Sequence, residues 1–159
     1  KIFSVKGRDF RNPISLIICK ADEINPLVKL IPDPAHKLMA AFWPGALTII
    51  FSASDIISPM LTAGTGKIGL RVSSHPLAQA VAQKLKKPLT ATSANLSGAP
   101  ECSTASEVIK QIGDKLDAIL DWGKTHGDKT STIVDVTVDP PIILREGAIS
   151  RQAIKKYIG

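Results

Sequence analysis

The chain alternates between short apolar runs and stretches in which apolar residues recur with a helical period. A compact apolar run bounded by polar or turn-forming residues is typical of a strand buried in a sheet. On this basis we predict strands over residues 13–20, 46–52, 68–72, 88–94, 117–122, 131–136 and 141–146.

Helix-start signals lie between these runs. Each is a residue or pair that can cap or open a first turn, and they are Asp33 with Pro34, Ser74, Thr104 with Glu107, and Ser150. Thr104 and Glu107 have the spacing of a capping box. After Ser74, the residues Leu77, Val81 and Leu85 form an apolar stripe. Residues 1–10 are expected to contain the end of a further helix.

Strands interleaved with helices predict a layered α/β (α+β) domain around one twisted sheet. The 44% hydrophobic content of the 159 residues suffices for a sizeable core, and no long Pro/Gly/Ser linker divides the chain. The short connection before residues 141–146 favours an antiparallel neighbour. We therefore expect a single domain over residues 1–159 with a mixed sheet.

Composition narrows the functional classes. Lys and Arg number 20 against 14 Asp and Glu, a net charge of +6, which favours a polyanionic partner such as a nucleotide or RNA but also serves solubility alone. No apolar run approaches the ~20 residues of a membrane-spanning helix, and no secretion signal is visible. Cys19 and Cys102 indicate reduced thiols in a cytoplasmic protein. Three dispersed histidines do not favour a zinc site, so we expect no metal held by the protein's own side chains.

Two nucleotide-binding motifs match only in part. Gly64, Gly66 and Gly69 satisfy G-x-G-x-x-G, but they precede a strand, so no helix N-terminus is available to a pyrophosphate. Gly66 and Lys67 resemble the end of a P-loop, but Ile68 replaces the required Ser or Thr. A flexible turn before a strand is the better account of these glycines. No G-x-S-x-G elbow supports a hydrolase.

Three polar segments at strand edges are candidates for a ligand site. In the first, Lys6 and Arg8 point to the same side of an extended segment, where a triphosphate would suit them. Without other evidence, a solvated basic turn is the simpler explanation. The second, residues 91–98, offers hydroxyls, an amide and backbone N–H groups to phosphate or ribose oxygens, but also fits an ordinary turn.

The third segment combines Ser131, at the start of one predicted strand, with Arg145 at the end of the next. The guanidinium of Arg145 suits a phosphate or a carboxylate. Equally, it suits a surface ion pair with Glu146 or Asp139 that contributes little.

In this order, the segments resemble the YrdC-like threonylcarbamoyl-AMP synthases. The resemblance includes KGR followed by NP, then WPGALTIIF, IGLRVSSHPLA, TSANLSG, STIVDV and REGAIS, from residue 1 to about residue 150. TSANLSG together with WPG-x-LT is its most specific part. The resemblance implies a twisted mixed sheet flanked by helices, with a concave, positively charged face.

The family resemblance also implies an activity. Such enzymes combine L-threonine, bicarbonate and ATP, with Mg²⁺, into threonylcarbamoyl-AMP and pyrophosphate, and a downstream enzyme transfers the threonylcarbamoyl group to a tRNA adenosine. Positioning and charge neutralisation supply most of the catalysis, so no side-chain nucleophile is assigned. Two alternatives remain open: a module of this fold that binds a nucleotide, tRNA or double-stranded RNA without turnover, and a domain of a hydrogenase-maturation protein.

Site residues follow from the motif matches. The resemblance implies ATP contacts by the residues matching its K-x-R, S-x-N and REG elements and their neighbours, namely Lys6, Arg8, Asn12, Lys67, Ser93, Asn95 and Arg145. Lys67 would act through its backbone. Arg71 would receive the threonine carboxylate, with Ser131 in the same pocket.

One family element is missing from this sequence. The family begins with a strand and a P-T-[DE]-T-x-Y-G-L type segment whose Thr helps to hold threonine, and residues 1–159 contain no match to it. We therefore expect these residues to bind ATP weakly and to turn over poorly. Replacing Lys6 or Arg8 by Ala is expected to weaken ATP binding far more than folding, because both are taken as surface residues.

Overall fold

Helices and strands alternate along almost the whole chain in the computed structural model, which describes residues 1–125 and 130–158. In chain order the elements are α1 (Ile2–Lys6), β1 (Ser15–Ile18), the 3-10 helix η1 (Ala21–Ile24), α2 (Asp33–Phe42), β2 (Leu47–Ser52), α3 (Pro59–Thr62), β3 (Lys67–Val72), α4 (Pro76–Leu85), β4 (Leu89–Ala91), α5 (Ala105–Ile112), the 3-10 helix η2 (Gly113–Lys115), β5 (Thr132–Asp135), β6 (Ile142–Arg145) and α6 (Arg151–Ile158).

The strands form one six-stranded sheet in the order β4-β1-β3-β2-β5-β6. The pairs β1/β3 and β2/β5 are parallel, and the other pairs are antiparallel. The expected α/β domain with a mixed sheet is confirmed. The predicted strand over residues 117–122 is wrong, because this segment pairs with no strand and leaves Leu120 and Trp122 63% and 69% exposed.

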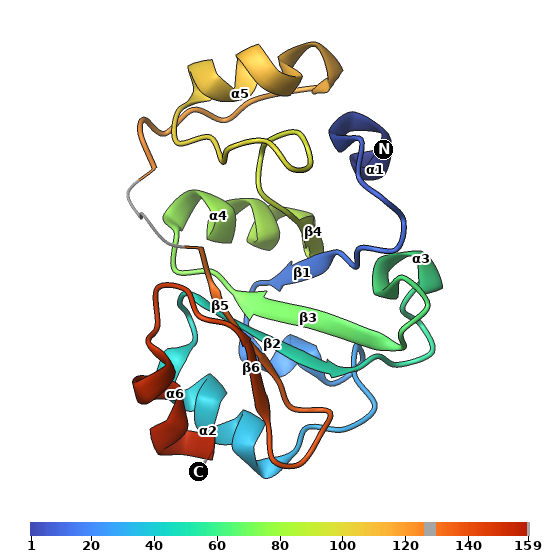
Figure 1. The fold of residues 1–159 in the computed structure, drawn as a ribbon, viewed down its shortest axis with the longest axis vertical. Helices are drawn as coiled ribbons and strands as arrows, with labels where there is room; N and C mark the ends of the chain where they lie inside the picture. Colours follow the sequence, from blue (N-terminus) through green and yellow to red (C-terminus); the bar gives the residue numbers. More distant parts are fainter. Residues whose placement is uncertain (126–129, 159) are drawn as a thin grey trace.

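One face of the sheet carries the main core. In β3, the fully buried residues Ile68 and Leu70 alternate with half-buried ones, so that successive side chains point to opposite faces. The core side packs against Leu38 of α2 and Ile154 of α6, both 0% exposed. Figure 1 shows α2 and α6 together on one side of the sheet, with α1, α4 and α5 toward the other end of the molecule.

The other face carries polar side chains on its middle strands, beside Ile17, Ile50 and Ile133. Lys67, Gly69 and Arg71 alternate with the core residues of β3, and Thr48 of β2 faces the same side. Of the residues singled out from the sequence, Lys67, Arg71, Ser131 and Arg145 lie on or beside this polar face.

Helix starts follow the sequence signals in part. The capping box of Thr104 and Glu107 is confirmed, and Ser150 Oγ accepts from an N–H of α6. The expectation that Asp33 caps α2 is wrong by one residue, because the carbonyl oxygen of Pro32 already accepts the first helical bond.

Before α4, the expected cap at Ser74 is also wrong, since His75 holds that position without a side-chain bond. The predicted stripe along α4 is only partly buried: Leu85 is 55% exposed, and Ala82 is the residue that is buried instead. The turn before β3 is confirmed, with Gly64 and Gly66 both at positive φ.

Candidate active site

A row of side chains crosses the polar face. Continuing the antiparallel register of β2 and β3 by one residue places Arg71 beside Thr48. On its other side Thr48 pairs with Ile133 of β5, and Ile133 pairs with Arg145 of β6. Neighbouring strands lie about 4.8 Å apart, so the two arginines flank a short stretch of sheet. We call Arg71, Thr48, Ser131 and Arg145 the strand cluster.

Arg71 is fixed by the turn that precedes β2. Its Nε donates to the carbonyl oxygen of Gly45 at 2.8 Å, and Gly45 N–H donates to the carbonyl oxygen of Val72. A Cβ at Gly45 would lie 2.3 Å from the carbonyl oxygen of Phe42, so the WPG motif requires glycine here. Burial lowers the pKa of Arg71 from its usual value. Among the described residues, only Nε of this guanidinium is hydrogen-bonded, so the remaining N–H groups are available to a ligand.

Ser131 joins the two sides of the strand cluster. Its Oγ lies 2.9 Å from Thr48 Oγ1, and its carbonyl oxygen accepts from Nη2 of Arg145 at 2.7 Å. The same Nη2 lies 3.4 Å from Ser131 Oγ. Within the described ranges, Arg145 forms no ion pair with Glu146 or Asp139, so the proposed surface pair is not what holds it.

The loop after β6 is fastened to the start of β5. Thr132 Oγ1 accepts from the N–H of Gly147 at 2.9 Å and donates to the carbonyl oxygen of Ile149 at 2.6 Å. A Cβ at Gly147 would lie 2.1 Å from the carbonyl oxygen of Thr130, so only glycine permits this approach. The REG segment thus holds its arginine beside the strand that starts at Thr132.

Lys67 and Asp135 form an ion pair on the same face. Their Nζ and Oδ2 atoms are 2.9 Å apart, and Asp135 Oδ1 accepts from the N–H and the hydroxyl of Thr137. Burial raises the pKa of Asp135, but the hydrogen bonds from Lys67 and Thr137 outweigh it and leave the pKa below its usual 3.8. The side chain of Lys67 is therefore engaged with a carboxylate, and a role for its backbone in ATP binding stays a prediction.

A second group of predicted residues meets at the end of α1. Lys6 is 4% exposed, and its ammonium donates to the carbonyl oxygens of Ser93 and Asn95 and to Asn95 Oδ1. The N–H of Ser97 donates back to the carbonyl oxygen of Lys6 at 2.9 Å. We call Lys6, Arg8, Ser93 and Asn95 the loop cluster.

The burial of Lys6 corrects one expectation. Burial lowers the pKa of Lys6, and the nearby charge of Arg8 lowers it further. The ammonium, with three donors and three oxygen partners, joins the end of α1 to the segment after β4. The premise that Lys6 is a surface residue is wrong, so replacing it will destabilise the fold as well.

Arg8 and Asn12 follow shortly after Lys6 in the sequence, but their side chains lie nearer to solvent. Arg8 donates from Nε to the carbonyl oxygen of Asn12 at 3.2 Å and from Nη2 to that of Pro13 at 2.8 Å. Its Nη1 group has no hydrogen-bond partner among the described residues. The Asn12 side chain is exposed.

Gly69 leaves the middle of the polar face without a side chain. A Cβ there would lie 2.6 Å from Ser15 Oγ and 3.2 Å from Thr48 Cγ2. Any other residue would crowd the space beside the strand cluster.

Sequence reasoning missed Thr48 and Asp135. Both are buried polar residues of otherwise apolar runs, 4% and 6% exposed, and both lie on the polar face. The available signal was a polar residue inside an apolar run that predicts a buried strand. A buried polar side chain needs a hydrogen-bond partner, so such a residue indicates that other polar groups lie nearby.

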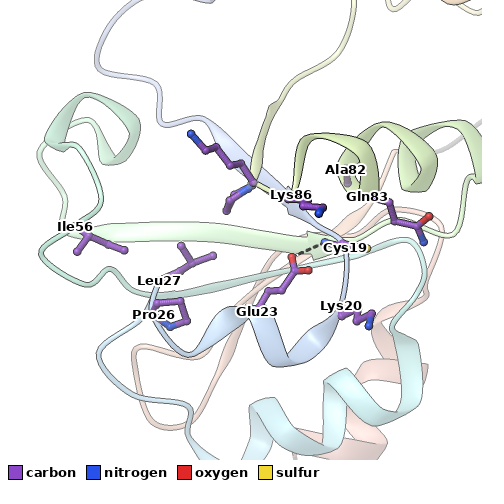
Figure 2. A pocket seen from close by; sticks show the side chains of 11 residues that line it. Cys19, Lys20, Glu23, Pro26, Leu27, Ile56, Ala82, Gln83 and Lys86 are labelled. Carbon is purple, nitrogen blue, oxygen red and sulfur yellow. Dashed lines mark hydrogen bonds between the residues drawn. The ribbon is translucent and has the colours of Figure 1, made fainter.

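The molecule also has a hollow of about 570 Å³ near η1 and the end of α4. Its walls include Cys19, Glu23, Leu27, Ala82 and Lys86, and Figure 2 shows Glu23 directed toward Cys19, whose N–H it accepts at 2.9 Å. No residue of the strand cluster or the loop cluster lines it, so this hollow is separate from the candidate site.

Over residues 1–125 and 130–158, no helix is long and apolar enough to cross a membrane. In the same ranges, no three or more His, Cys, Asp or Glu side chains are grouped so that they could hold a metal ion.

Fold and site together define an α/β protein whose open sheet face gathers arginine and hydroxyl groups. The Sua5/YciO/YrdC family model, described as "Telomere recombination", matches residues 1–147. The chain belongs to this family, as its motifs predicted.

Relatives and solved structures agree with this assignment. The threonylcarbamoyl-AMP synthase of Bacillus subtilis (strain 168) is 37% identical over 160 residues, which cover 100% of this chain and 46% of that protein. The threonylcarbamoyl-AMP synthase of Vibrio parahaemolyticus is 40% identical over 151 residues, 92% of this chain and 80% of that protein. The crystal structure of P. abyssi Sua5 complexed with L-threonine superposes with a TM-score of 0.96 at 34% identity, over 99% of this chain and 46% of that one. The chain thus spans about half the length of the first curated relatives it matches.

Proposed function

We propose that the protein containing this chain is an L-threonylcarbamoyladenylate synthase. It makes threonylcarbamoyl-AMP and pyrophosphate from L-threonine, bicarbonate and ATP. The observation that carries the proposal is the strand cluster, which places guanidinium and hydroxyl donors on one open face in a chain similar to named synthases.

Threonine recognition is assigned to Arg71 and Ser131. Nε of Arg71 is held by Gly45, which leaves the Nη groups to form hydrogen bonds with a carboxylate. Ser131 lies on the other side of Thr48, within reach of the same amino acid. The L-threonine bound to P. abyssi Sua5 supports this class of ligand.

ATP recognition is assigned to the loop cluster, Asn12, Lys67 and Arg145. Arg8 is its principal phosphate ligand, because Nη1 is free of other partners among the described residues. Lys6 acts by holding the loop that carries Ser93 and Asn95. The buried Asn95 side chain bonds Lys6 and the carbonyl oxygen of Ala99, so it shapes this loop, and the exposed Ser93 is the residue of the loop assigned to contact the nucleotide. Mg²⁺ arrives bound to the ATP phosphates, as part of the substrate.

The chemistry requires two anions to meet. The threonine amine attacks bicarbonate to give a carbamate and water, and a carbamate oxygen then attacks the α-phosphorus of ATP as pyrophosphate leaves. The carbamate and the ATP phosphates are both negatively charged. Fixed cations therefore lower the barrier by stabilising the negative charge of the transition state. Arg8 and Arg145 are the side chains that this proposal assigns to that role.

The product serves tRNA modification in the cytoplasm. An activated acyl phosphate such as threonylcarbamoyl-AMP is consumed by a group-transfer enzyme, and the tRNA adenosine is the acceptor proposed here. Direct binding of tRNA or double-stranded RNA by this chain is not required.

The test measures threonylcarbamoyl-AMP by mass spectrometry and threonine-dependent pyrophosphate release, using the full encoded protein. Arg71→Lys is expected to lower kcat/KM for threonine about 100-fold, because one ammonium cannot reproduce two parallel hydrogen bonds. Arg151→Lys, an exposed arginine of α6, is the matched control. RNA binding without any threonine-dependent pyrophosphate release would overturn the proposal. An early-melting Arg71→Lys with unchanged threonine dependence would reduce Arg71 to a structural residue.

A further inference from the structure

Thr48 occupies an unusual place for a hydroxyl. It lies in β2, it is 4% exposed, and it is on the polar face of the sheet between Arg71 and Ser131. Among the described residues, its Oγ1 has a single hydrogen-bond partner, Ser131 Oγ at 2.9 Å.

The side chain of Thr48 is held from both sides. Its methyl carbon lies 3.2 Å from where a Cβ at Gly69 would be, so it occupies the space beside β3 that glycine leaves open. Its hydroxyl is directed to the opposite neighbour, toward Ser131 at the start of β5. A β-branched side chain in a strand has few alternative rotamers, so this arrangement is fixed.

The direction of the hydrogen bond follows from the available partners. A buried hydroxyl proton needs an acceptor, and Ser131 Oγ is the one that Thr48 has within the described part of the chain. Arg145, whose Nη2 lies 3.4 Å from the same Oγ, can only donate. We therefore assign Ser131 Oγ as the acceptor, which leaves its own proton free of both neighbours.

We propose that Thr48 is a positioning residue that makes the Ser131 hydroxyl a donor toward an anionic group of the substrate. This inference rests on the proposed function. The Arg71 guanidinium lies on the other side of Thr48 and also only donates. Two donors that flank one position suit a carboxylate, so the group they receive is the carboxylate of the amino-acid substrate.

The test separates the contribution of the Thr48 hydroxyl from that of the volume and branching of the side chain. Thr48→Val keeps the volume and branching but removes the donor, and it is expected to raise the KM and the Kd for threonine about tenfold. The KM for ATP is expected to change less than twofold. Thr48→Ser restores the hydroxyl and is expected to return threonine affinity to within about threefold of wild type. Threonine binding is measured by calorimetric titration and turnover by pyrophosphate release.

Non-additivity gives a readout that general loosening of the fold would not produce. Thr48→Val combined with Ser131→Ala is expected to bind threonine no more weakly than Ser131→Ala alone, because Thr48 acts through that hydroxyl. Additive losses, or a Thr48→Val protein with wild-type threonine affinity, would overturn the inference while the proposed function stands. A wild-type protein that binds no threonine would overturn both. If Thr48→Val does not fold, Thr48→Ala in the same cycle decides the question.

Discussion

The strand cluster and the loop cluster hold similar side chains by different means. In the strand cluster, the arginines stand on sheet strands, and each donates to a backbone carbonyl oxygen supplied by a glycine-dependent turn or by Ser131. In the loop cluster, the buried ammonium of Lys6 joins α1 to the segment after β4. Strand positions are fixed by backbone pairing, whereas the loop positions depend on the side chains of Lys6, Asn95 and Gln111.

This difference suits the loop cluster and three members of the strand cluster, Arg71, Thr48 and Ser131, to different tasks. Arg145 stands on β6 but is assigned to ATP. Recognition of a small amino acid requires donors fixed within a fraction of an ångström, which strands provide. A polyphosphate presents many equivalent oxygens, and loops with backbone N–H groups accommodate it. The comparison therefore predicts that backbone changes harm the strand cluster most, while a single side-chain change harms the loop cluster.

The largest effect is expected from Gly147→Ala. The new Cβ would meet the carbonyl oxygen of Thr130 at 2.1 Å, so the loop after β6 must shift at a cost of roughly 3 kcal/mol. Gly98→Ala is the control: it has a positive φ of 83° but open space around it, and about 1 kcal/mol is expected. Urea unfolding measures both. Equal losses would show that steric approach is not what fastens this loop.

Lys6→Met should follow, with a loss of about 2 kcal/mol. The change leaves the carbonyl oxygens of Ser93 and Asn95 without their buried donor. Hydrogen exchange of the Ser97 N–H, which bonds to Lys6, should accelerate together with the fall in unfolding free energy. The exposed Lys84→Met is the control, with a change within ~0.5 kcal/mol. If the two variants behave alike, Lys6 does not hold the loop.

Asp135→Asn tests the ion pair between Lys67 and Asp135 through the pH dependence of stability. The folded pKa of Asp135 lies below 3.8, so its contribution is complete above that value and is lost as pH falls through the lower folded value. At pH 7 the variant is expected to lose about 1 kcal/mol, a figure reduced for the partial exposure of Lys67. Its stability should also fall less steeply below pH 4. Thermal melts from pH 2 to 7 measure this, beside the exposed control Asp114→Asn, and an unchanged acid limb would contradict it.

Arg8→Ala should affect stability least, within about 1 kcal/mol, because the side chain is half-buried and bonds only neighbouring carbonyl oxygens. ATP affinity should nevertheless fall by on the order of 1.5–3 kcal/mol, the range for a lost charge-assisted contact. Calorimetric titration with ATP and a melting curve measure the two quantities on one sample. Unchanged ATP affinity would remove Arg8 from the proposed phosphate site.

The local pattern of hydrophobic and polar residues predicted most helices and strands, because it indicates which segments are buried. β2 and β3 were visible as apolar runs, since both lie in the middle of the sheet. Residues 117–122 have a similar composition but no strand beside them. Whether a segment finds a strand to pair with depends on how distant parts of the chain pack together, which a local sequence pattern does not indicate. The order of the strands in the sheet could not be predicted for the same reason.

The site was predicted through motifs, and its energetics were not. Lys6 appeared as part of a basic turn because charged letters usually indicate solvent, yet three oxygens compensate its burial. Thr48 was hidden because its neighbours in sequence are apolar, and its partner Ser131 is 83 residues away. Each omission concerns a polar group whose environment is created by another part of the chain.

The contact between Lys6 and Asn95 also bears on when the loop cluster assembles. It closes a loop between residues 89 apart, whereas the contact of Thr132 with Gly147, which fastens the loop after β6, joins residues 15 apart. Taken separately, the longer closure costs about 1.5 kcal/mol more chain entropy. The loop cluster is therefore expected to order after the loop that follows β6 during folding and to open before it under stress.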